Sequence, residues 1–230
     1  MTLQQYIESI SRVFPSKGQT EITLDINNGL KDFAEKTKIK TGMWTFTISS
    51  GVVTGTNEAS AALTIIQPVE SSKFFSVAIP SNMISFSDIK VYGTDSAQMN
   101  SEVFYEVTET HLRVYNAVQV SSEGVFDATS FSTPERIELS VSVYPTALSA
   151  LGDVPDIPAA YHRALESYVF SLYYRRQPMI AQGQQGGQYA VNINMAREFD
   201  AEYQSYVIRG KKHYFLNYQM GQTVADGWNY

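Results

Sequence analysis

The first forty residues carry apolar side chains at helical spacing in two short runs. The first run ends before Pro15 and Gly18, residues that stop a helix. The second follows Thr20, which we expect to cap a helix, and lysines lie near its C-terminal end, where cations suit the helix dipole. We therefore expect a helical hairpin over residues 1–42, closed by Gly42. The apolar positions are Tyr6, Ile7, Ile10, Val13 and Phe14 in the first run and Ile22, Ile26, Leu30, Phe33 and Ala34 in the second.

Between residues 43 and 150 the period of the pattern changes to two. Short runs rich in β-branched and aromatic residues are separated by clusters of Gly, Pro, Asn, Asp and Ser. This pattern predicts about seven to nine antiparallel strands in a sandwich or barrel. The clearest hairpin is FYEVTETHLRVY, in which a polar Glu109–Thr110 turn separates two alternating runs.

After Pro145 the helical period returns. A rigid lead-in that contains Pro155 and Pro158 precedes a helix that runs to Arg176 and is stopped by Pro178. The Gly- and Gln-rich residues 181–188 predict a flexible loop. A fourth helix then ends at Gly210, which completes a second hairpin over residues 151–210. Its apolar face holds Met195, Ala196, Phe199, Tyr203, Tyr206 and Val207, of which we expect at least Phe199 and Tyr203 to be buried.

Residues 211–230 predict an extended C-terminal arm. Its five aromatic residues lack the spacing to face one helical core, yet so many large apolar side chains are rarely left in water without a use. We expect the arm to become ordered on a partner, and the alternative is a tail that packs back on its own domain. These candidate partner-binding residues are Tyr214, Phe215, Tyr218, Trp228 and Tyr230.

The pattern as a whole predicts an α+β fold. A four-helix unit built from both chain ends carries an antiparallel β-sandwich or barrel domain, inserted where the two ends of the insert lie close together. Charge follows the same division: residues 1–42 have six Lys/Arg and five Asp/Glu, residues 43–150 have four and eleven, and residues 151–230 have seven of each. The acidic middle segment is therefore a compositional block of its own.

The amino-acid composition excludes several classes of function. The chain has 230 residues and no cysteine, which excludes disulfides, thiolate zinc sites, iron–sulfur clusters and cysteine nucleophiles. Hydrophobic residues make up 43% and charged residues 17%, as in a globular protein whose surface is partly covered by partners. No basic leader begins the chain and no apolar run approaches the length of a membrane span, so we expect a soluble protein made in the cytoplasm, with no membrane partner.

Catalytic chemistry finds little support. The three histidines, His111, His162 and His213, form no metal-binding pair, and the nucleophile-elbow, phosphate-loop and dinucleotide motifs are absent. Glu198 and Glu202, with Asp200 between them, have the spacing to present carboxylates to an ion, although a solvated helix face is the more common meaning. We expect no enzyme activity, no cofactor and no metal.

The aromatic residues allow two interpretations. Three tyrosines, at positions 168, 173 and 174, precede Arg175 and Arg176 in a mixture that resembles a surface for single-stranded nucleic acid. Core and subunit-contact roles are favoured, because the chain is acidic overall and shows no continuous basic groove. Arg175 and Arg176 remain candidate partner-binding residues. Trp44 or clustered tyrosines in the β-domain offer a second candidate surface, one that would stack on sugars.

The helical segments resemble a known family. The sequence PDIPAAYHRAL at residues 155–165, followed by an aromatic helix, a Gly/Gln loop and the helix MAREFDAEYQSYV, resembles the C-terminal helical hairpin of tailed-phage head-to-tail adaptors. These proteins also commonly begin with a pair of amphipathic helices, as residues 2–39 do. The resemblance covers roughly half of the chain, and the large β-insertion departs from the smallest adaptors.

The resemblance implies a mechanical role in the neck of a virion. Adaptors of this family assemble as closed rings, typically dodecamers, on the portal vertex, and they offer a platform for the next neck or tail ring. DNA passes through the lumen of such a ring without being read. The alternative is a phage or bacterial surface module whose β-domain recognises a receptor or glycan while the helices attach it.

Overall fold

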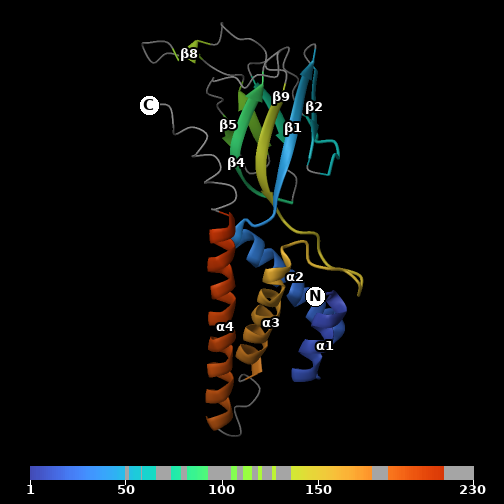
Figure 1. The fold of residues 1–230 in the computed structure, drawn as a ribbon, viewed down its shortest axis with the longest axis vertical. Coiled ribbons are helices and arrows are strands. Elements are labelled where there is room, and N and C mark those ends of the chain that lie inside the picture. The colour runs from blue at the N-terminus through green and yellow to red at the C-terminus, as the bar shows by residue number, and fades with distance from the viewer. Residues whose placement is uncertain are drawn as a thin grey trace. The chain divides into compact units, whose positions relative to one another are not determined.

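The computed structural model places helices and antiparallel strands in separate parts of the chain, an α+β arrangement (Figure 1). The chain divides into two compact units: the helical unit, Met1–Lys40 with Tyr144–Tyr230, and the β-unit, Thr41–Val143. The β-unit thus starts before the expected residue 43 and ends before the expected residue 150. The residues that the structure describes are 1–49, 52–57, 59–65, 74–78, 82–92, 105–107, 111–115, 119–120, 126–127, 136–177 and 186–214.

The described part of the helical unit contains four α-helices from both ends of the chain. A short 3-10 turn, η2, leads into the third helix. The helices are α1 (Leu3–Val13), α2 (Gln19–Thr37), α3 (His162–Arg176) and α4 (Gly186–Tyr214), and η2 covers Ala159–Tyr161.

Local sequence explains how the two N-terminal helices begin and end. Thr2 and Gln5 form a reciprocal capping box at the start of α1. The expectation that Thr20 caps α2 is wrong, because Gly18 occupies the N-cap position and Thr20 lies inside the first turn. At the other end Lys38 adopts a left-handed conformation, with φ of 53°, and stops the helix. Gly42 does not close the hairpin, since it already lies in the first strand.

One hydrophobic core joins the helices of this unit. Side chains from α4 enter it at intervals of three and four residues, the period of one helical face. Tyr203 is fully buried, as expected, whereas Phe199 is partly buried and packs against the core. The buried residues of the α4 face are Asn192, Ala196, Tyr203, Val207, Gly210 and Tyr214.

α4 is longer than the sequence pattern indicated. It begins at Gly186, so the last three residues of the predicted loop 181–188 are helical, while residues 181–185 lie outside the described part. It also continues past Gly210 to Tyr214. Gly210 does not end the helix, and it lies instead in a close contact between helices: a Cβ added there would lie 2.7 Å from the Thr37 Cγ2 methyl group of α2.

The β-unit contains a four-stranded sheet in the order β2-β1-β9-β4 and a three-stranded sheet in the order β3-β6-β5, and every pair is antiparallel. The predicted hairpin is confirmed by the pairing of β5 with β6, although its turn at 109–110 lies outside the described residues. The strands are β1 (Thr41–Ser49), β2 (Val52–Thr56), β3 (Phe74–Ala78), β4 (Met83–Tyr92), β5 (Tyr105–Val107), β6 (His111–Tyr115), β7 (Gln119–Val120), β8 (Phe126–Asp127) and β9 (Arg136–Val143).

The segment Ala61–Ile65 connects the edges of these two sheets. Leu63 N donates to Gly55 O of β2 at 2.8 Å, and Ala78 N of β3 donates to Thr64 O at 3.2 Å. Leu63 and Ile65 pack against a second hydrophobic core, which is separate from that of the helices. The buried residues of this core are Trp44, Phe46, Val53, Val77, Ile137, Leu139, Val141 and Val143.

Candidate interaction surface

Two of the three carboxylates considered as an ion site on α4, Asp200 and Glu202, instead contact side chains of α3. Glu202 accepts from the Ser167 hydroxyl at 3.0 Å and lies 3.2 Å from the Arg163 guanidinium. Asp200 lies 3.2 Å from the guanidinium of Arg175. Within the described residues, no group of three or more His, Asp or Glu side chains is arranged to hold a metal ion.

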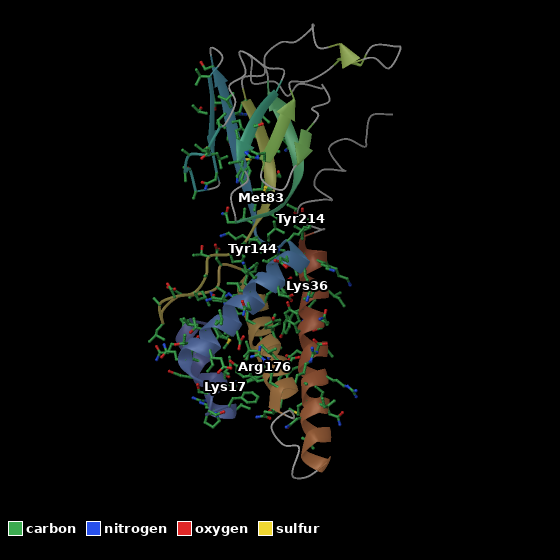
Figure 2. All side chains as sticks on the ribbon, turned by 180° about the vertical axis from the view of Figure 1, so that it is seen from behind. Lys17, Lys36, Met83, Tyr144, Arg176 and Tyr214 are labelled. Carbon is green, nitrogen blue, oxygen red and sulfur yellow. The ribbon has the colours of Figure 1, made fainter. Side chains whose placement is uncertain are left out.

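Arg175 and Arg176, the basic candidates for partner binding, both reach acidic residues of their own unit. Arg175 makes the contact to α4 just described, and its side chain is still half exposed. Arg176 turns toward α2, where its guanidinium lies 3.5 Å from Asp25 and 4.0 Å from Glu21. Figure 2 shows Arg176 beside Lys17, which pairs with the same Glu21. Each arginine therefore has a structural contact and an exposed surface.

The tyrosines considered for nucleic-acid stacking are packing groups. Tyr173 is buried, and the Phe14 ring meets it edge-on at a centroid distance of 5.2 Å. Tyr174 stacks on Phe199, and Tyr168 packs against the same core. Burial raises the pKa of Tyr173, and the neighbouring Asp25 carboxylate raises it further. These rings hold α3 in place and present no exposed stacking platform.

The three histidines lie in different elements of the structure. His162 is buried at the start of α3, where its Nε2 lies 3.0 Å from Ile157 O and its Nδ1 lies 2.8 Å from the Met1 amino nitrogen. Burial lowers the pKa of His162, so the imidazole is neutral at pH 7 and serves as a hydrogen-bonding group of the core. His213 packs edge-on against Tyr161, and His111 begins β6.

The segment between the β-unit and α3 is a loop fixed at several points. Its backbone at Leu148 exchanges two hydrogen bonds with the Asn27 side chain of α2, at 2.8 and 3.0 Å. The Asp153 carboxylate accepts from the backbone N–H groups of Ser149 and Ala150, at 2.7 and 2.8 Å, and these bonds lower its pKa. We call residues 145–160 the pinned loop.

The pinned loop also completes the start of α1. Leu3 N donates to Asp153 O at 2.8 Å, and Gln4 N donates to Leu151 O at 2.9 Å. The first N–H groups of a helix have no partner within the helix, so these carbonyls satisfy two of them. Figure 1 shows the loop beside α1, on the opposite side of α2 and α3 from α4. Long connections with little secondary structure are usually either functional or disordered, and this one has a fixed backbone.

Large apolar side chains are exposed on this loop and on α4. Leu151 is 45% exposed and Val154 54%, although both belong to a fixed backbone. On α4, Ile208 is 56% exposed and Val191 54%. The sequence pattern did not single out these residues: Ile208 and Val191 fall outside the apolar stripe of α4, and Leu151 and Val154 lie in a loop that has no apolar period. For the two loop residues, the signal in the sequence was the absence of Lys and Arg between residues 145 and 160.

The aromatic candidates of the C-terminal arm divide at residue 214. Tyr214 does not belong to an arm: it lies in the last turn of α4 and is buried. The expectation that residues 211–214 are extended is therefore wrong, because the helix continues through Lys211 and Lys212. The other four arm candidates, Phe215, Tyr218, Trp228 and Tyr230, lie outside the described residues.

Trp44, the candidate for sugar stacking, lies in the core of the β-unit with 1% of its surface exposed. It is therefore not placed to contact a glycan.

No known protein-family model matches the chain, and no curated protein matches its sequence. Among the helices that the structure describes, none combines the length and apolarity needed to cross a bilayer.

Proposed function

We propose that the chain is a structural virion protein, a subunit of a head-to-tail adaptor ring. In this role a closed ring of copies docks on the portal of a tailed phage and carries the next neck or tail ring, with DNA passing through the lumen. The protein then lies at the portal vertex of the virion and performs no catalytic step.

The observation that carries this proposal is the position of residues 155–165. This segment, which resembles the adaptor hairpin, begins in the exposed pinned loop and continues into α3. Three features fix the loop immediately before this segment, at residues 148–153: the Asn27 side chain, the Asp153 carboxylate and the backbone of α1. A fixed surface loses little conformational entropy on binding, which favours stable assembly.

The finer architecture is part of the same proposal. We propose that α1–α4 act as one four-helix unit that carries ring assembly, and that the β-unit is a sandwich or barrel. Support for the latter comes from the segment Ala61–Ile65, which bridges the edges of the two sheets and brings Leu63 and Ile65 to one core. Closing a sheet in this way protects strand edges from unwanted pairing.

The direct test is to incubate the purified full-length chain with its cognate portal ring and to image the mixture by negative stain. An added ring coaxial with the portal supports the proposal. A portal that stays bare while the chain is folded contradicts it. A β-unit that binds host-surface glycans while the helical unit shows no affinity for the portal would favour the receptor-module alternative.

A further inference from the structure

The outward face of α4 combines an apolar centre with positive charge. Ala201, Gln204, Ile208, Lys211 and Lys212 recur at intervals of one to four residues and are all exposed, so they lie opposite the buried face of the helix. We call these five residues the α4 stripe. No ion pair joins Lys211 or Lys212 to any residue in the part of the chain that the structure describes.

The pinned loop has the complementary character. Leu151 and Val154 are exposed on a fixed backbone, and residues 145–160 contain Asp153 and Asp156 but no Lys or Arg. Hydrogen bonds from the backbone lower the pKa of Asp153 and keep it charged. Asp156 pairs with Lys40, yet its side chain remains 58% exposed. This surface therefore combines two exposed apolar side chains with two carboxylates, one of which, Asp156, is paired with Lys40.

The two surfaces lie on opposite sides of the helical unit. In Figures 1 and 2, the loop and α1 lie on one side of α2 and α3, and α4 lies on the other. A subunit therefore cannot join its own loop to its own stripe. A second copy of the chain can bring the apolar centres together with basic residues facing acidic ones, a match that steers and orients association.

We propose that the pinned loop of one subunit packs on the α4 stripe of the next, with Leu151 and Val154 against Ile208. The contact is heterologous, because the two surfaces differ, and a heterologous contact repeats until a ring closes. This inference rests on the proposed ring function and names the two faces that form the ring contact.

The natural absence of cysteine makes the contact directly testable. Val154→Cys and Ile208→Cys each place one thiol at an exposed position, and a disulfide forms only where two Cβ atoms approach within about 4.5 Å. We expect little cross-linking of either variant alone under oxidation and a strong covalent dimer when the two are mixed. The double variant should give a ladder of oligomers. Val191→Cys mixed with Val154→Cys is the matched control, since Val191 is equally exposed on α4 but lies outside the stripe; this pair should stay uncross-linked.

Each result of the cross-linking experiment either supports or contradicts the proposed contact between the pinned loop and the α4 stripe. Cross-linking of Val154→Cys alone or Ile208→Cys alone, at the level of the mixture, would mean a symmetric contact and would overturn the inference. Rings that form with the wild-type chain while the mixture stays uncross-linked would also overturn it, and would leave the proposed function standing. A chain that remains monomeric at high concentration and in the presence of its portal would contradict both the proposed contact and the proposed function.

The two lysines of the α4 stripe allow a second, independent test of this contact. Lys211→Glu with Lys212→Glu should abolish most of the cross-linked dimer formed by the thiol pair, because both changes place like charges opposite the acidic loop. Circular dichroism confirms that this variant is folded. An undiminished yield would contradict the proposed pairing of the two faces.

Discussion

Individual residues determine how closely the helices approach. Gly29 of α2 faces the Tyr168 ring of α3, and a Cβ added at Gly29 would lie 2.8 Å from Tyr168 Cδ1. Glycine lowers helix stability by about 1 kcal/mol relative to alanine, so its presence in the middle of α2 needs a reason. The reason is the close crossing of the two helices.

Gly29→Ala should therefore destabilise the protein. Overpacking of a closely packed contact typically costs about 1–3 kcal/mol and outweighs the gain in helix propensity. Urea denaturation measures the change, with Asn28→Ala as the matched control, because Asn28 is the exposed neighbour on the same helix. Equal stability of both variants would mean that the helices do not cross at Gly29.

Buried tyrosines give the protein an alkaline limit. Burial raises the pKa of Tyr203, and the hydrogen bond from its hydroxyl to Asp32 Oδ2, at 2.5 Å, raises it further. The unfolded chain releases this proton near pH 10, whereas the folded protein retains it to higher pH. This contribution to stability is complete below pH 10 and is lost as the pH rises above it.

Tyr203→Phe removes that proton release. The free energy of unfolding of the wild type should fall above pH 10, and the fall in the variant should be shallower by about 1.4 kcal/mol per pH unit. Urea denaturation at several values between pH 8 and pH 11 measures both slopes. Identical slopes would show that Tyr203 ionises equally in the folded and unfolded protein.

At the scale of elements, the pinned loop is held by side chains that helical periodicity does not mark. Asn27 exchanges two hydrogen bonds with the backbone at Leu148, across 121 residues of sequence. Hydrogen bonds from such side chains satisfy backbone N–H and C=O groups that a helix or a strand would otherwise satisfy.

Asn27→Ala should destabilise the protein by about 1–3 kcal/mol, the net value of two hydrogen bonds in a partly buried position. Asn28→Ala, one residue further along α2, again serves as the exposed control. Hydrogen exchange provides the local readout: the Leu148 amide should lose protection in the Asn27 variant. Retained protection would show that the loop is fixed by its other contacts.

The helical faces and the change from helices to strands were predictable from the sequence. Each shows as a regular spacing of apolar residues within a single segment. Ile22, Ile26 and Leu30 are buried at the spacing that predicted α2. The ends of α4 were not predictable, since Gly186 and Gly210 break the usual rules for glycine. Gly210 instead lies in a close contact with Thr37, a residue distant in sequence.

The exposed apolar surface of the pinned loop was harder to predict from the sequence, because it also depends on contacts between residues that are distant in the chain. Leu151 and Val154 become a surface only because Asn27 and α1 fix the loop backbone around them. Likewise, the partners of Asp200 and Glu202 lie on α3, so their role in joining two helices follows from tertiary packing alone.

At the scale of the whole molecule, each of the two units has its own hydrophobic core. A unit with a complete core folds independently of its neighbour, and insertions are tolerated where their ends lie close together. The ladder of β1 with β9 brings these ends together, because Thr41 pairs with Ser142.

Replacing Thr41–Val143 with a short Gly/Ser linker should leave a folded helical unit that still binds the portal. Circular dichroism establishes the fold, and co-sedimentation with the portal ring measures binding. A folded helical unit that fails to bind would place the portal contact in the β-unit and contradict our division of roles.

A mass measurement can decide whether the chain forms a closed ring on a portal. Native mass spectrometry of the full-length chain, alone and with its cognate portal ring, counts the copies bound. We expect one discrete complex that contains a complete ring of subunits for each portal. A mass equal to the portal alone, or a continuous distribution of bound copies without a closed stoichiometry, would contradict it.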